Sequence, residues 1–85
     1  MKKIIVVEIN DCRVVASVTV KDTIDDAVKV ANELLIKHCE LIDRSGDLKD
    51  SNCLGDFGKA TPRNRNAWSN LGSENWDAHI IEIDI

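Results

Sequence analysis

The sequence predicts a small α+β protein in which one amphipathic helix packs on one face of a three- to four-stranded sheet. Three observations support this fold class: helical periodicity over residues 22–42, a β-branched hairpin before it, and an alternating strand at the end of the chain. The expected order is β-β-α-β, with a long irregular excursion at about residues 43–76 before the last strand. The 85 residues suit a single domain, 1–85.

The helix is predicted from the spacing of its apolar residues. Asp22 or Thr23 can cap its first turn, and Asp25 and Asp26 place negative charge at the positive end of the helix dipole. The apolar arc is wide, as in a helix that packs on a sheet. It consists of Ile24, Ala27, Val28, Ala31, Leu34, Leu35, His38, Cys39 and Ile42, with Leu41 beside it.

The hairpin is predicted from two β-branched runs, residues 3–9 and 14–20, joined by a polar turn at residues 10–13. One register places both apolar rows on the same face. It pairs Ile9 with Val14, Val7 with Ala16 and Ile5 with Val18. The opposite face keeps other apolar residues, and we expect it to be partly covered. These are Ile4, Val6 and Val15.

The last strand is predicted at residues 78–85, where Ile81, Ile83 and Ile85 alternate with Ile80 and polar residues. The sequence does not decide the position of this strand in the sheet, which is either beside the first strand or at the outer edge.

The excursion before the last strand is rich in Asp, Ser, Asn and Gly and has no clear periodicity. So long an unstructured segment is unusual in a small domain. We therefore expect it to be partly ordered, with short strands near residues 57–61 and 67–71 and a turn at Pro62. Trp76 is expected to plug one end of the helix–sheet interface.

Composition narrows the function classes. The net charge of −4 argues against general affinity for nucleic acid. Cys12, Cys39 and Cys53 have no paired spacing, which indicates a reducing cytoplasm and not a disulfide framework. The apolar run near the N-terminus is too short for a signal peptide or a membrane span.

Candidates for chemistry are few. His38, His79, Cys39 and Cys53 have suitable side chains, but no spacing among them defines a catalytic set or a zinc site. We therefore expect no enzyme activity, no catalytic residue, no metal and no cofactor.

Residues 57–68 form the most distinctive local segment, because they carry basic residues between Phe57 and Trp68 without any acid. Such a segment suits a nucleic-acid strand or an acidic protein groove. Alternatively, its arginines pair with acids of the same molecule and its aromatic side chains cover the core. The candidate partner-binding residues are Lys59, Arg63, Arg65 and Trp68, together with Asp47, Asp50 and Asp56 in the excursion.

The stretch DTIDDAVKVANELL, residues 22–35, resembles the start of the helix in HicB-type antitoxins, where a hairpin is likewise followed by a helix. That resemblance implies an antitoxin module. It covers a short part of the chain, and the proline–glycine segment expected before the helix is missing from this sequence. In outline, a small acidic β-β-α-β chain also resembles phage- and mobile-element-encoded inhibitors, including some anti-CRISPR proteins.

The leading hypothesis is a non-catalytic cytoplasmic module that binds protein and acts as a monomer or a homodimer. In its most specific form, it is an inhibitor that covers a basic, nucleic-acid-handling host protein, with acidic residues supplying complementarity. The alternative hypotheses are a nucleic-acid-binding accessory protein that uses the basic segment, and a HicB-like antitoxin module.

Overall fold

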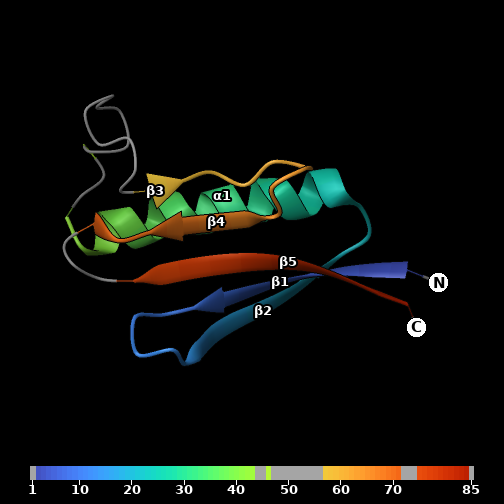
Figure 1. The fold of residues 1–85 in the computed structure, drawn as a ribbon, viewed down its shortest axis with the longest axis horizontal. Coiled ribbons are helices and arrows are strands. Elements are labelled where there is room, and N and C mark those ends of the chain that lie inside the picture. The colour runs from blue at the N-terminus through green and yellow to red at the C-terminus, as the bar shows by residue number, and fades with distance from the viewer. Residues whose placement is uncertain (1, 44–45, 47–56, 72–74, 85) are drawn as a thin grey trace.

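The structure is a computed structural model that describes residues 2–43, 46, 57–71 and 75–84. Five antiparallel strands form one sheet in the order β2-β1-β5-β4-β3, and one helix lies against it (Figure 1). The α+β class is confirmed. The elements are β1 (Lys2–Ile9), β2 (Val15–Lys21), α1 (Ile24–Leu41), β3 (Phe57–Gly58), β4 (Asn66–Ser69) and β5 (Trp76–Asp84).

The predicted count of three to four strands was wrong, because the excursion contributes two further strands to the sheet. β3 and β4 lie close to the two short strands that the sequence suggested near residues 57–61 and 67–71. They are too short for an alternating pattern to identify them. β4 pairs with β5 from Asn66↔His79 to Ser69↔Trp76, so its place in the sheet depends on a strand distant in sequence.

The last strand lies beside the first, which decides between the two positions left open by the sequence. β5 pairs with all of β1, from Lys2↔Asp84 to Ile9↔Asp77, and with β4 on its other side, so it occupies the centre of the sheet. Lys2 pairs with Asp84, so the first and last residues that the structure describes are neighbours in the sheet (Figure 1).

The predicted hairpin register was wrong by two residues for Ile5 and Val7, which pair with Val20 and Val18. Ile9 pairs with Val15, after a bulge between Glu8 and Ile9. Val18 and Val20 still share a face with Ile5 and Val7, as predicted. The prediction was wrong for Val15, which was expected on the opposite face: after the bulge it pairs with Ile9 on this one.

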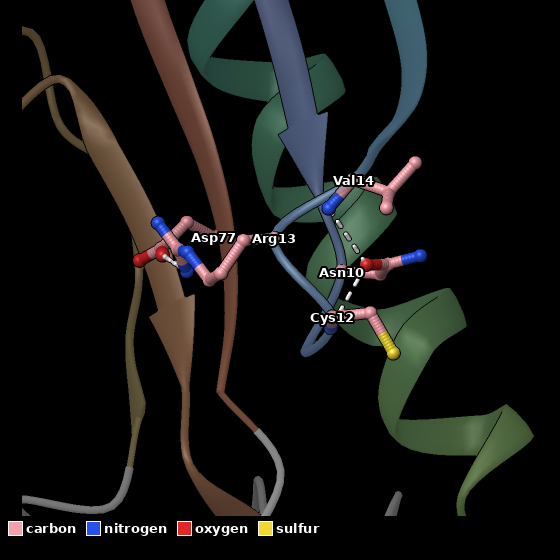
Figure 2. Close-up of polar contacts among 5 residues, drawn as sticks. All are labelled: Asn10, Cys12, Arg13, Val14 and Asp77. Carbon is pink, nitrogen blue, oxygen red and sulfur yellow. Dashed lines mark hydrogen bonds and ion pairs between the residues drawn. The ribbon is translucent and has the colours of Figure 1, made fainter.

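The loop between β1 and β2 accounts for the change in register. The Asn10 side-chain oxygen accepts hydrogen bonds from the backbone N–H groups of Cys12 and Val14, at 3.0 and 3.1 Å (Figure 2). The Asn10 N–H in turn donates to the Val14 carbonyl at 3.0 Å. Val14 is therefore bound into the loop, and the strand begins at Val15.

The helix covers the face of the sheet that carries Ile4 and Val6, for which the sequence predicted only partial cover. Alanines on both layers allow the helix to approach closely: Ala27 and Ala31 on α1, Ala67 and Ala78 on the sheet, all fully buried. Larger side chains fill the remaining space, and these are Leu35, Cys39, Ile80 and Trp76.

The helix ends are closed by local hydrogen bonds. The Thr23 hydroxyl accepts from the Asp26 N–H at 3.1 Å, so Thr23, one of the two predicted residues, is the N-cap. At the other end, Asp43 has a positive φ of 59° and its N–H donates to the Glu40 carbonyl. Leu41, which the wheel placed beside the apolar arc, is 78% exposed.

A salt bridge joins the start of the sheet to the segment before the helix. Lys3 donates a hydrogen bond to the Asp22 carboxylate, and this bond together with the lysine charge lowers the Asp22 pKa from its ordinary value of 3.8. Because the folded pKa lies below the unfolded one, the contact stabilises the protein above about pH 4 and is lost as the pH falls through the lowered value.

We therefore expect Asp22→Asn to remove this acid-range component of stability. An NMR titration of wild-type protein should give an Asp22 midpoint below 3.8. Urea midpoints measured from about pH 5 to about pH 2 should fall less steeply for the variant than for wild type. An equal pH dependence in both proteins would contradict the assignment.

Candidate protein-interaction surface

The face of the sheet opposite the helix carries a continuous aliphatic surface, which we call the open face. It consists of Ile5, Val7 and Ile9 on β1, Val15, Val18 and Val20 on β2, and Ile81 and Ile83 on β5. His79, opposite Val7, and Asp77, opposite Ile9, share this face. Four of these side chains are about half exposed: Val15 at 55%, Val18 at 58%, Val20 at 56% and Ile81 at 46%. Contiguous apolar surface of this kind makes the open face a candidate interaction site.

The open face follows directly from the alternation of the strands. Successive side chains point to opposite faces, so the row from Ile5 to Ile9 shares a face with its partners on β2 and β5. Ile5 pairs with both Val20 and Ile81, which places three aliphatic side chains side by side across three strands. Cross-strand pairs of β-branched residues favour this flat packing.

An ion pair lies at each end of the open face. The Lys3–Asp22 pair lies at one end, and at the other Arg13 donates to Asp77 at 2.8 Å. Figure 2 shows Arg13 reaching from the hairpin loop to Asp77 on β5, while Asn10 holds the loop from within. Arg13 has a φ of 61°, a backbone region that few side chains occupy, so the loop carries local strain where it meets the open face.

Trp68 extends the same face across β4 to β3. It pairs with Asp77 on one side and with Gly58 on the other, and its indole ring lies over Gly58. A pocket of about 280 Å³ opens beside it, lined partly by Arg13, Asn75 and Asp77. This volume is at the lower limit for small-molecule sites, so the pocket is better described as the polar margin of the open face.

Gly58→Ala is expected to displace the Trp68 ring, because the added Cβ would overlap the indole. We expect the free energy of unfolding to fall by about 1–2 kcal/mol, together with a change in tryptophan fluorescence. The double variant Gly58→Ala/Trp68→Ala should lose clearly less than the sum of the two single variants. Additive losses would show that the ring and the glycine do not interact.

On the helix side of the sheet, both carboxylate oxygens of Glu8 accept hydrogen bonds from within the fold. They accept from the Trp76 indole N–H at 2.9 Å and from the Ser17 hydroxyl at 2.8 Å. The Trp76 ring stacks on His38 with the ring centres 5.1 Å apart. Trp76 therefore fills this end of the helix–sheet interface, as the sequence predicted. The contacts among Glu8, Ser17, Trp76 and His38 give these side chains a structural role.

The four predicted partner-binding residues that the structure describes, Lys59, Arg63, Arg65 and Trp68, lie on different parts of the fold. Arg65 lies 3.9 Å from Glu82, on the helix side of the sheet, whereas Trp68 lies on the open face. Lys59 and Arg63 are exposed in the connection between β3 and β4. Asp47, Asp50 and Asp56 lie outside the described residues.

The sequence missed the open face as a site, although the signal was present. The alternation of β1, β2 and β5 identified the apolar row, but nothing in the row itself shows on which side the helix lies. The small residues Ala67 and Ala78 on the other side were the available signal, because they let a helix approach closely.

Other site classes find no support in the described part of the chain. No three His, Cys, Asp or Glu side chains within it gather as a metal site would require. Cys12 is exposed and Cys39 buried, and neither forms a disulfide. The helix among these residues is not apolar enough along its length to cross a membrane. Comparison with protein-family models, curated proteins and solved structures found no match.

Proposed function

We propose that this protein is a non-catalytic protein-binding module whose binding surface is the open face. The observation that carries the proposal is the exposure of Val15, Val18, Val20 and Ile81 on one face of the sheet. Aliphatic side chains supply no nucleophile, acid or base, but they gain free energy when another apolar surface excludes water from them. Such a surface is suited to holding a protein and unsuited to chemistry.

The charge of the molecule supports a basic partner, such as a nucleic-acid-handling protein that the module would occlude in the cytoplasm. Four cationic side chains are paired within the fold: Lys2 and Arg65 with Glu82, Lys3 with Asp22, and Arg13 with Asp77. The outer face of α1 exposes the acids Asp25, Asp26, Glu33 and Glu40 together with Lys29 and Lys37, so acids outnumber lysines on it. An acidic exterior of this kind would speed association with a basic protein and make it salt-dependent.

Affinity capture with matched variants tests the binding surface. Val18→Lys places a charge in the centre of the open face, and Leu41→Lys makes the same change of charge at an exposed leucine of α1, away from that face. Capture should run after nuclease treatment and be read by mass spectrometry. We expect a protein retained by wild type and Leu41→Lys to be lost with Val18→Lys. Identical retention by all three would contradict the open face as the binding surface.

The electrostatic part has its own test. Glu33→Lys together with Glu40→Lys reverses two exposed charges of α1 without touching the open face. Binding to a basic partner at low salt should weaken, mainly through a slower association rate. Unchanged binding at low salt would remove the basic-partner form of the hypothesis and leave the open face in place.

A further inference from the structure

We infer that the open face docks a second copy of this chain, so that two sheets pack face to face with their helices outside. This inference rests on the proposed function, because it names the partner of the same surface. In the resulting dimer the two aliphatic faces would form the centre of a four-layered assembly, helix–sheet–sheet–helix. Face-to-face sheets about 10 Å apart are a common way to bury such surfaces.

The size of the open face fits a small dimer interface. Three adjacent strands of about seven residues cover roughly 14 by 25 Å. With the exposed fractions of its side chains, we estimate about 500 Å² of accessible surface on each copy, or about 1,000 Å² in the dimer. That total reaches the lower limit for a specific interface, so we expect a dissociation constant in the micromolar range.

The open face is also complementary to itself. Most of its side chains are Val and Ile, with His79 beside Val7 on β5, and a two-fold axis brings the same patch of each copy together. The charged residues at its ends are already paired, Lys3 with Asp22 and Arg13 with Asp77. A second copy therefore meets no unpaired charge at these two ends, although each chain carries a net charge of −4.

The residues that the structure describes leave the open face uncovered, with Val15, Val18, Val20 and Ile81 about half exposed. A second copy of the chain supplies an equal aliphatic area.

Sedimentation equilibrium on wild type, Val18→Lys and Leu41→Lys tests the inference. Wild type and Leu41→Lys should move from about 9.5 kDa to about 19 kDa as concentration rises through the micromolar range. Val18→Lys should stay near the mass of one chain, with self-association weakened by about 100-fold or more, because the dimer would bury two unpaired lysines. The change raises the net charge from −4 to −3, so added general repulsion cannot explain a loss.

Circular dichroism should show that each variant is folded, and Val20→Lys, at a neighbouring exposed position of the open face, replaces Val18→Lys if that variant unfolds. Two results overturn the inference: wild type that stays monomeric throughout, or dimerisation that neither lysine weakens. In the first case, loss of a captured protein with Val18→Lys would leave the proposed function standing with a different partner. Capture unaffected by Val18→Lys would overturn both.

Discussion

Replacing Trp76 with alanine should lower the free energy of unfolding by about 4–5 kcal/mol, at the upper end of what a single truncation in a protein core costs. Trp76 is 2% exposed, stacks on His38 and donates to Glu8. The alanine leaves a cavity under the C-terminal end of α1 and removes one hydrogen-bond donor from a part-buried carboxylate. The free energy of unfolding of a small domain is only about 5 kcal/mol or a little more, so a large part of the Trp76→Ala variant should be unfolded at 25 °C.

Urea denaturation followed by far-UV circular dichroism measures this loss, and two variants separate its causes. Trp76→Phe keeps a ring against His38 but loses the indole donor, so we expect a smaller loss of about 1–2 kcal/mol. Trp68→Phe changes the other tryptophan, which is half-buried on the open face, and should cost less than about 1 kcal/mol. Equal losses for Trp76→Ala and Trp68→Phe would contradict the structural role assigned to Trp76.

Asn32→Ala should lower the free energy of unfolding by about 2–3 kcal/mol. The Asn32 amide forms two hydrogen bonds to the backbone of Ala60: its nitrogen donates to the carbonyl at 3.0 Å, and its oxygen accepts from the N–H at 2.7 Å. Ala60 is buried, so both backbone groups would lose their partner without gaining water. This pair of bonds attaches the connection between β3 and β4 to the helix.

Hydrogen exchange at the Ala60 amide gives the local readout. Asn32→Asp retains the acceptor for the Ala60 N–H but cannot donate to the carbonyl, so its effect should be intermediate. We expect the protection of the Ala60 amide to fall strongly in Asn32→Ala and less in Asn32→Asp, while amides in β1 change only with overall stability. Unchanged protection at Ala60 in Asn32→Ala would show that other contacts hold this connection.

The features that the sequence predicted well are those set by nearby residues. The apolar arc from Ile24 to Ile42, the Thr23 cap and the alternation around Ile81 each depend on contacts or periodicity within a few residues. The same holds for the shared apolar face of the hairpin. These local patterns determined the helix, three of the strands and the α+β class.

The features that it missed depend on distant residues. β4 is a strand because β5 pairs with it, and four residues are too few to show a period. The hairpin register depends on one side chain, Asn10, which binds Val14 into the loop. The covered face depends on alanines from three elements that meet only in the folded protein, such as Ala31, Ala67 and Ala78.

The candidate site changed for the same reason. Composition drew attention to the basic segment around Arg63 and Arg65, because charges stand out in a linear sequence. In the fold, Arg65 is close to Glu82 and the aliphatic row becomes the exposed feature. An apolar row has functional meaning only once the element that could cover it is known to lie elsewhere.

The central claim is that the open face docks a second copy of this chain. The most direct test is methyl NMR with a paramagnetic probe dissolved in the solvent. At concentrations well above the dissociation constant, the methyl groups of Val18, Val20 and Ile81 should be shielded from the probe, while those of Leu41 on the helix should be broadened. Dilution should restore broadening at the open face alone. Equal broadening of Val18 and Leu41 methyl groups at every concentration would contradict the claim.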